Sequence, residues 1–288
     1  MKTPKPAFSN LPMDHPEFDA IAKWYDFDYE RRVREDLPFY FRSACEGGNP
    51  VLELGAGTGR VTAVLALGGF DVTAVDLSSK MLDRARLRFN RLKNSRGKVR
   101  FVCADMADLK LRGRYRTILV PFRSFHHLYS IERQMATLRT IRRLLAPDGI
   151  AVFDLLQPDL TYFGAIEGKT NISYERKRRD KGTKVVQRFR LMCDFPRQMG
   201  YIEYMWDEYK GKRKVGSDRA LMRWRWFHVF EFEHLLSRAG LRVIRICGGF
   251  DGRPYGSDAR EMIFVAGRDQ SPTARRSRPG ARSRSSSV

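Results

Sequence analysis

Hydrophobic positions change their spacing several times along the 288-residue chain, and each change predicts an element of structure. Apolar residues recur every three or four positions in 17–25, 37–45, 61–67, 81–89, 131–145 and 230–239, which predicts amphipathic helices. Short apolar runs predict buried strands at 51–54, 70–75, 99–103, 115–120, 150–155, 241–247 and 262–266. Because strands and helices alternate over the first half, the pattern predicts a doubly wound α/β domain with a largely parallel sheet.

A different pattern occupies residues 161–227. Apolar and polar positions alternate in 172–178, 185–192, 201–209 and 220–226, and turn-forming residues separate these segments. Alternation with a period of two is typical of half-buried strands joined by hairpins. The segment therefore predicts an antiparallel sheet inserted after the fifth strand. Its pattern is compatible with a cover over a substrate site and with a contact in a homodimer.

The two ends of the chain differ from the segments between them. Residues 1–48 are expected to form an N-terminal helical segment, and residues 49–160 with 228–268 the α/β domain. Residues 269–288 consist mostly of serine, arginine and proline with little to bury, so this basic tail is expected to be disordered.

No apolar run has the length of a membrane span, and the N-terminus lacks the features of a secretory signal. The expected location is the cytoplasm.

Net charge raises the question of a nucleic-acid partner. The formal charge is +21, and part of the excess lies in the C-terminal tail. The remaining basic residues are spread over helix faces, as in Arg84, Arg86 and Arg88, and do not form one block with interleaved aromatic residues. We therefore interpret them as a solvated surface and do not expect nucleic acid as the partner.

The four cysteines have no metal-ligand spacing, so no metal site is expected, and Cys103 is expected in the core.

A glycine-rich turn follows the first predicted strand. Residues 51–59 read Val-Leu-Glu-Leu-Gly-Ala-Gly-Thr-Gly, with glycines at Gly55, Gly57 and Gly59. The dinucleotide fingerprint Gly-x-Gly-x-x-Gly requires its third glycine one residue later, so this turn departs from it. Glu53 would repel a pyrophosphate, but it could face the cationic amino group of an amino-acid-bearing ligand. The turn therefore predicts a site for a nucleoside without a pyrophosphate.

Three motifs in order along the chain resemble those of class I methyltransferases that use S-adenosylmethionine. These are Glu-Leu-Gly-Ala-Gly-Thr-Gly, Ala-Val-Asp-Leu-Ser around Asp76, and Ala-Asp-Met at Asp105 and Met106. The resemblance implies a seven-stranded sheet with an antiparallel last strand and S-adenosylmethionine as cofactor. It also implies that the glycine turn lies under the methionine part, that Asp76 holds the ribose hydroxyls, and that Asp105 and Met106 border the adenine. The residues expected at the cofactor are Tyr25, Tyr29, Glu53, Gly55, Gly57, Gly59, Asp76, Leu77, Met81, Asp105, Met106 and Pro121.

Tyr25 and Tyr29 lie in the aromatic and acidic stretch Trp-Tyr-Asp-Phe-Asp-Tyr. In related small-molecule methyltransferases an N-terminal segment of this kind folds over the cofactor and presents a tyrosine. The alternative is that these rings pack against the sheet edge.

The loop after the fourth strand is expected to border the transferred methyl group, because ligands bind at the carboxyl ends of strands in such sheets. It reads Pro-Phe-Arg-Ser-Phe-His-His-Leu from residue 121, and resembles the loop of methyltransferases that act on amino sugars and related small amines. The resemblance implies that His127 holds or deprotonates the acceptor; a structural hydrogen bond is the alternative. Phe122, Arg123 and His126 are expected to border the acceptor. Arg123 would bind a carboxylate or phosphate, or form a surface ion pair.

The sequence thus predicts an S-adenosylmethionine-dependent methyltransferase acting on a nitrogen or oxygen of a small molecule. Two alternatives remain. An RNA or DNA methyltransferase is supported by the charge, although the loop lacks an Asn-Pro-Pro-Tyr type motif and a Pro-Cys nucleophile. A noncatalytic cofactor-binding protein would keep the same pocket. The acceptor and the oligomeric state are not defined by the sequence.

Overall fold

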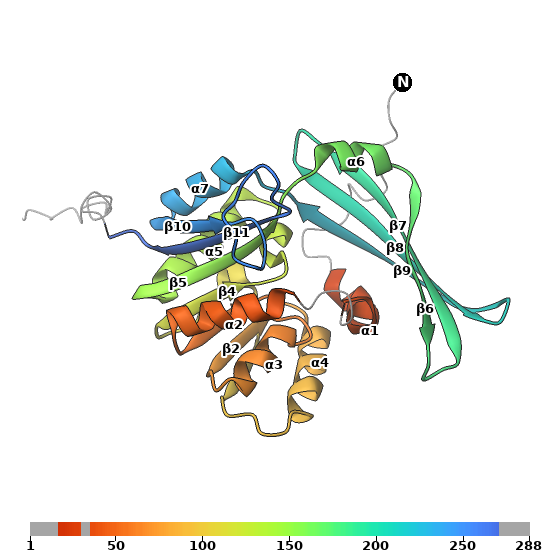
Figure 1. Ribbon diagram of the computed structural model, residues 1–288, viewed down its shortest axis with the longest axis horizontal. Coiled ribbons are helices and arrows are strands. Elements are labelled where there is room, and N and C mark those ends of the chain that lie inside the picture. Colours follow the sequence, from red (N-terminus) through yellow and green to blue (C-terminus); the bar gives the residue numbers. More distant parts are fainter. Residues whose placement is uncertain (1–16, 30–34, 271–288) are drawn as a thin grey trace, which may run out of the picture.

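The computed structural model describes residues 17–29 and 35–270. The predicted disordered tail from residue 271 onward and the first sixteen residues of the predicted N-terminal segment lie outside the described part. Two sheets make up most of the structure, and one helix lies between them (Figure 1).

The larger sheet has seven strands in the order β10-β11-β5-β4-β1-β2-β3. Neighbouring strands from β3 to β5 run parallel, whereas β11 runs antiparallel to both β5 and β10. This confirms the predicted doubly wound sheet with an antiparallel last strand. The strands are β1 (Val51–Leu54), β2 (Val72–Asp76), β3 (Val99–Cys103), β4 (Tyr115–Val120), β5 (Leu145–Leu156), β10 (Leu241–Cys247) and β11 (Glu261–Arg268).

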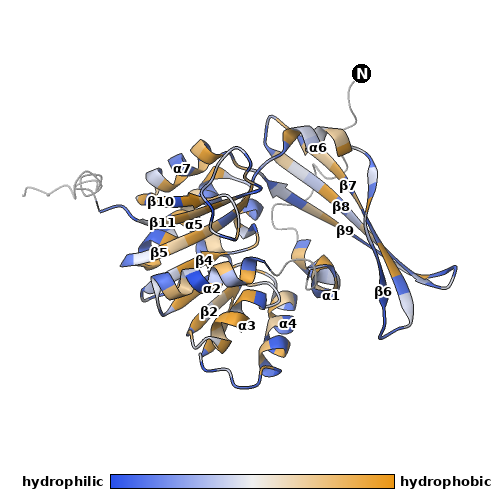
Figure 2. Ribbon diagram, in the orientation of Figure 1, coloured by the Kyte–Doolittle hydropathy of each residue, from blue (hydrophilic) through white to orange (hydrophobic). Residues whose placement is uncertain are grey.

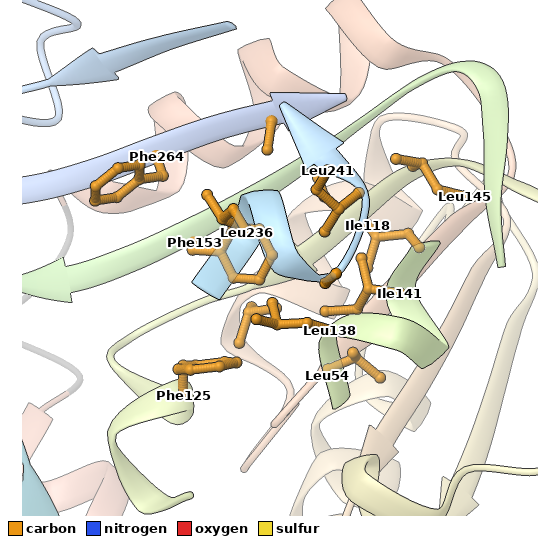
Figure 3. Packing of buried hydrophobic residues seen from close by; sticks show 14 of the residues in the cluster. Leu54, Ile118, Phe125, Leu138, Ile141, Leu145, Phe153, Leu236, Leu241 and Phe264 are labelled. Carbon is orange, nitrogen blue, oxygen red and sulfur yellow. The ribbon is translucent and has the colours of Figure 1, made fainter. Parts of the chain in front are cut away.

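Helices cover both faces of this sheet (Figure 1). The helices are α2 (Asp36–Gly47), α3 (Arg60–Leu67), α4 (Ser79–Asn90), α5 (Ile131–Leu144) and α7 (Val229–Arg238). Side chains of α5 and α7 form one core with the strands, in which Leu138, Phe153 and Phe264 are fully buried (Figure 3). Side chains of α2 and α3 form a second core on the opposite face. The strands are therefore buried on both sides, which explains their nearly continuous apolar runs.

Two details differ from the predicted elements of the larger sheet. Residues 146–149, which separate the predicted helix 131–145 from the predicted strand 150–155, lie inside β5. The pairing of β5 with β4 shifts register there, between Tyr115 and Thr117. Cys103 is exposed and is not a core residue. It is the last residue of β3, which forms an edge of the sheet and is only partly covered.

The smaller sheet confirms the predicted antiparallel insertion, with strand order β6-β7-β8-β9. Its strands are β6 (Thr170–Arg178), β7 (Thr183–Asp194), β8 (Met199–Lys210) and β9 (Arg213–Arg225), and the short helix α6 (Leu160–Ile166) precedes them. Figure 2 shows that these strands alternate between hydrophobic and hydrophilic residues, whereas those of the larger sheet are mostly hydrophobic. The inserted sheet therefore has one apolar face and one polar face.

Ion pairs cover the polar face of the inserted sheet. Arg188 lies 2.8 Å from Asp207, and Glu203 accepts hydrogen bonds from Arg190 at 2.7 Å and Arg219 at 3.2 Å. The acidic residues stand on β8 and their basic partners on the two neighbouring strands. The charged side chains of the polar face thus pair with one another. The opposite, apolar face is the one available to form a core or a cavity.

Helix α1 (Glu17–Tyr29) lies between the two sheets, with its Ile21 and Trp24 in a core shared with the inserted sheet. Trp24 stacks on Trp206 of β8, with ring centroids 5.7 Å apart. Asp28 is buried and accepts hydrogen bonds from Trp206 Nε1, the Tyr174 hydroxyl and Gln187 Nε2. One carboxylate thus satisfies donors from three strands. In the described ranges 17–29 and 35–270, no helix is long and apolar enough to cross a bilayer.

Replacing Asp28 with alanine is expected to destabilise the protein strongly. The buried Trp206 N–H and Tyr174 hydroxyl would lose their acceptor, at about 1–3 kcal/mol for each group left unpaired. Asp180→Ala, in the exposed turn between β6 and β7, is the matched control and should cost less than about 0.5 kcal/mol. Urea unfolding measures both changes. Equal free energies of unfolding for the two variants would contradict the role of Asp28.

Candidate active site

A cavity of about 480 Å³ lies between the carboxyl edge of the larger sheet, helix α1 and the apolar face of the inserted sheet. Its volume is within the range of small-molecule sites. The larger sheet contributes the glycine turn and the ends of β2 and β3, whereas the inserted sheet contributes side chains from β7, β8 and β9. The loop after β4 lies between these two halves and also lines the cavity.

The glycine turn presents backbone to the cavity at Gly55 and Gly57. All three glycines have positive φ, with +81° at Gly55, +54° at Gly57 and +77° at Gly59, which other residues rarely adopt. A β-carbon added at Gly57 would meet nothing closer than Tyr25 at 4.0 Å, so the space above Gly57 is open. Gly59 does not line the cavity; a β-carbon there would lie 3.0 Å from that of Ala85. Gly59 therefore allows α3 and α4 to pack closely.

Asp76 lies at the end of β2, directly beside the glycine turn. Its carboxylate accepts hydrogen bonds from the backbone N–H of Gly57 at 2.7 Å and from that of Ser78 at 2.8 Å. Burial raises the pKa of Asp76 above its usual value, while these two N–H donors act in the opposite direction. The carboxylate is thereby oriented at the cavity edge, where it can accept hydrogen bonds from a pair of hydroxyl groups. Leu77 and Met81 line the cavity beside it.

Asp105 and Met106 line the cavity at the end of β3. One carboxylate oxygen of Asp105 accepts the backbone N–H of Ala107 at 2.8 Å, and the other lies 2.8 Å from Arg133 on α5. These bonds fix the turn that presents the Met106 side chain. The structure thus brings Asp76, Asp105 and Met106 to the same cavity as the glycine turn.

Glu53 and Pro121 do not line this cavity. They border a small adjoining pocket, which shares Tyr25, Gly55 and Phe122 with it. The carboxyl group of Glu53 is 1% exposed and accepts a hydrogen bond from the Thr62 hydroxyl at 2.5 Å. Burial raises its pKa to about 8, so the group is largely protonated at neutral pH. Its contact with a cationic amino group stays a prediction.

Tyr25 and Tyr29 of α1 both line the cavity, with ring centroids 4.9 Å apart. Both rings pack edge-on against Phe122 of the loop after β4, at 6.3 Å and 5.2 Å between centroids. Burial raises the pKa of each hydroxyl well above its usual value, so both remain protonated. The rings therefore pack against the loop after β4 and border the cavity, and their contact with the cofactor stays a prediction.

The loop after β4 begins with two residues in left-handed conformation, Phe122 at φ +50° and Arg123 at +62°. The Tyr40 hydroxyl accepts the N–H of Phe122 at 3.1 Å and donates to Asp154 at 2.8 Å. Arg123 donates one guanidinium nitrogen to both oxygens of Glu261, at 3.0 and 3.1 Å. This supports the ion-pair alternative for Arg123. Strained backbone held in this way is typical of functional sites.

His126 has no ring nitrogen available for an acceptor molecule. The N–H of Leu156 donates to its Nε2 at 3.0 Å, so Nδ1 carries the hydrogen and donates to the carbonyl of Arg225 at 2.6 Å. Burial lowers the pKa of His126 well below its usual value, which keeps the ring neutral. His126 nevertheless lines the cavity, and its contact with the acceptor stays a prediction. His126 also joins the loop to β5 and β9.

His127 has the opposite environment. Its Nδ1 lies 3.4 Å from the Tyr129 hydroxyl, which donates to Glu17 at 2.8 Å or to the carbonyl of Arg223 at 3.1 Å. Because both of these partners only accept, the Tyr129 oxygen is left to accept a hydrogen from Nδ1 of His127. His127 also hydrogen-bonds the backbone of Arg223, and with the hydrogen on Nδ1 the Nε2 atom carries a lone pair. Burial lowers the pKa of His127, and Glu17 partly opposes this.

Sequence reasoning missed the residues that support His127. Glu17 and Arg223 form a buried ion pair at 2.6 Å, with side chains 3% and 6% exposed. Together with Tyr129, they come from α1, β9 and the loop before α5. No short motif contains these three residues. A buried Glu-Arg pair consists of the same residue types as the many surface ion pairs of this chain, so the sequence does not distinguish the two.

Comparison with known proteins agrees with this geometry. Residues 51–149 match the family model described as a methyltransferase domain. The chain is 28% identical over 218 residues to the cypemycin N-terminal methyltransferase of a Streptomyces species, covering 76% of this chain and 82% of the relative. It is 28% identical over 192 residues to a glycine/sarcosine N-methyltransferase of Aphanothece halophytica, covering 63% of this chain and 69% of the relative.

Solved structures show the same fold. The CcbJ methyltransferase from Streptomyces caelestis superposes with a TM-score of 0.77 at 24% identity, covering 90% of this chain and 99% of that one. The family match shows a methyltransferase domain at residues 51–149, and the sheet order and the CcbJ superposition show the fold of class I S-adenosylmethionine-dependent methyltransferases. The cofactor of the protein is S-adenosylmethionine, and the open space above Gly57 beside the Asp76 carboxylate fits that molecule.

Replacing Gly57 with leucine is expected to weaken S-adenosylhomocysteine binding by roughly a hundredfold, about 2.7 kcal/mol, because the side chain would fill the open space of the cavity. Gly182→Leu is the matched control. Its φ of +62° is close to that of Gly57, and a β-carbon there meets nothing within 4 Å. Titration calorimetry measures both affinities. An unchanged affinity in the Gly57 variant would exclude the assignment of this turn to the cofactor.

Glu53→Gln is expected to reduce the loss of stability at alkaline pH. The folded-state pKa of about 8 lies above the usual value, so the unfolded chain releases its proton first. The contribution of Glu53 to stability is therefore present at acidic pH and is lost as pH rises from about 4.5 through 8. The variant should lack this dependence. Melting temperatures of the two proteins between pH 5 and 9 test it, and parallel curves would contradict the protonated state of Glu53.

Proposed function

We propose that the protein transfers the methyl group to a nitrogen of a small-molecule amine and that His127 is the base. The observation that carries this proposal is the buried ring of His127, which lines the same cavity as the glycine turn and has a lone pair on Nε2 when its hydrogen is on Nδ1. The glycine/sarcosine enzyme is an N-methyltransferase by name, which supports the choice of nitrogen.

The chemistry requires little from the protein beyond alignment and proton transfer. S-adenosylmethionine supplies an electrophilic methyl group when bound. An amine at neutral pH is largely protonated and has no lone pair, so it must first lose a proton. Nε2 of the neutral His127 accepts that proton. The nitrogen lone pair then forms the new N–C bond as the C–S bond breaks, and the product leaves as a methylated ammonium ion.

The surroundings of His127 suit a base in this position. Burial favours the neutral ring, which is the form able to accept a proton. The nearby Glu17 carboxylate favours the charged ring that results from proton transfer. Edge-on contact with Phe18, at 4.7 Å between centroids, and the hydrogen bond to Tyr129 hold the plane of the ring. His127 is therefore oriented from two sides by residues that do not react.

Replacing His127 with alanine is expected to lower kcat by about a hundredfold or more, the usual contribution of a general base, with cofactor affinity changed less than about twofold. His234→Ala, on the exposed side of α7, is the control and should change neither quantity. Formation of S-adenosylhomocysteine and calorimetric titration measure the two effects. Equal losses of turnover and cofactor affinity would show that His127 is structural.

Activity should fall as the pH decreases below about 6.5. Protonated His127 cannot accept a proton. Because the pKa of His127 lies below the usual histidine value, the loss of activity occurs at pH values below that usual value. His127→Ala should lack this acidic limb. A pH profile of kcat in the wild type and the variant tests the sign, and an acidic limb that persists in the variant would contradict the assignment.

The nucleic-acid alternative has only the net charge of +21 in its favour. Arg123, Arg133 and Arg223, the arginines that line the cavity in the described part, each pair with a carboxylate of the protein. We propose on this ground that nucleic acid is not the acceptor. Methylation of transfer RNA or DNA at moderate salt would overturn this choice. Product formed from neither class would favour a noncatalytic binding protein.

A further inference from the structure

The half of the cavity formed by the inserted sheet is largely apolar. Most of its wall consists of side chains from α6 and from three strands of that sheet, namely Phe163, Phe189, Leu191, Ile202, Met222 and Trp224, whereas Tyr162, Tyr204 and Arg223 add polar groups. This half faces the loop that carries His127, whereas the glycine turn, Asp76 and Asp105 belong to the other half. The acceptor, which must reach His127, therefore has its body against the apolar wall.

One part of this wall is a flat aromatic surface. Trp224 of β9 pairs with Gly200 of β8, and a β-carbon added at Gly200 would lie 2.2 Å from the indole nitrogen and 2.4 Å from the adjoining ring carbon. The indole can lie over the β8 backbone only because residue 200 has no side chain. Phe163 meets the Trp224 ring edge-on, with centroids 5.3 Å apart. Such a surface suits a planar apolar group.

The charges at the cavity exclude one type of acceptor. An amino acid such as glycine presents a carboxylate next to its amine, and this anion needs a cationic partner when it leaves water. Arg123 is held by Glu261, Arg133 by Asp105 and Arg223 by Glu17. No other arginine and no lysine lines the cavity in the described ranges. A carboxylate would therefore have to break an existing ion pair.

Resting on the proposed function, we propose that the acceptor is an amine with a flat, apolar body and without a carboxylate beside the amine. The acceptor class of this protein thus differs from that of the glycine/sarcosine N-methyltransferases to which its sequence is similar. It also differs from a free amino sugar, because the apolar side chains that form most of this wall offer no hydrogen-bond partners to several hydroxyl groups.

Binding measurements on protein saturated with S-adenosylhomocysteine test this acceptor class directly. Titration calorimetry with 2-phenylethylamine, glycine and glucosamine should show the aromatic amine binding at least tenfold more tightly than either of the others. Comparable affinities, tighter binding of glycine or glucosamine, or no measurable affinity for 2-phenylethylamine would overturn the proposal.

Gly200→Ala tests the aromatic surface. The added methyl group would displace the Trp224 indole, so the affinity for 2-phenylethylamine should fall at least fivefold while that for S-adenosylhomocysteine stays unchanged. Gly216→Ala in β9 is the matched control, because a β-carbon there makes only an ordinary contact with Glu208 at 3.6 Å. Trp224→Leu, which keeps an apolar side chain but removes the flat ring, gives a second measurement and should show the same loss. Unchanged affinity for 2-phenylethylamine in both Gly200→Ala and Trp224→Leu would overturn the proposal.

Product analysis of the same mixtures separates the acceptor class from the proposed function. Mass spectrometry should detect N-methylated 2-phenylethylamine. If that amine binds tightly but is not methylated, the transfer to nitrogen is contradicted, whereas the apolar acceptor site is supported. If glycine is methylated and 2-phenylethylamine is neither bound nor methylated, transfer to nitrogen is supported and the proposed acceptor class is overturned.

Discussion

Helix α1 joins the two sheets of this protein through carboxylates on opposite sides of the helix, and the cavity depends on that connection. Glu17 and Asp28 bind groups of the inserted sheet, whereas Asp26 binds Arg84 and Arg88 of α4. A buried carboxylate is costly unless it is paired, so each of these bonds restricts where α1 can lie. The inserted sheet is thereby held over the carboxyl edge of the larger sheet. Without α1, the apolar wall and the glycine turn would lose this connection.

The same constraint explains why two adjacent histidines have different roles. His126 is fixed by backbone groups of Leu156 and Arg225, and it joins the loop to both sheets. His127, one residue later, contacts Phe18 of α1 and lines the cavity. The left-handed backbone at the start of the loop makes this alternation possible. A small shift of α1 would therefore change the orientation of the proposed base.

Much of the fold could be predicted from the sequence because its signals are local. Buried parallel strands produce apolar runs, and the hairpins of the inserted sheet produce alternation between turn residues. The sites of Asp76 and Asp105 were implied by the resemblance of their motifs to those of class I methyltransferases, and both residues lie at or just after the ends of parallel strands that end at the same edge of the sheet. The exposure of Cys103 was not predictable from its apolar neighbours, because it depends on β3 being an edge strand, which is a property of the whole sheet.

The site was predicted less completely, because its acceptor half comes from segments far apart in the sequence. Gly59 resembles Gly57 in the motif, yet it packs against α4. The different environments of the two histidines depend on the carbonyl of Arg225 and on Tyr129, neither of which belongs to the loop motif. The aromatic surface requires Gly200 of β8 to lie opposite Trp224 of β9. The sequence of one strand alone does not determine which residues of the neighbouring strand it pairs with.

The account rests on one cavity that holds the cofactor at the glycine turn and the acceptor at the inserted sheet. A crystal structure with S-adenosylhomocysteine bound tests this most directly. The account predicts the ribose hydroxyls at Asp76, the adenine beside Asp105 and Met106, and the sulfur facing the loop of His127 with open space toward Trp224. A ligand bound elsewhere, or a sulfur turned away from the apolar wall, would contradict it.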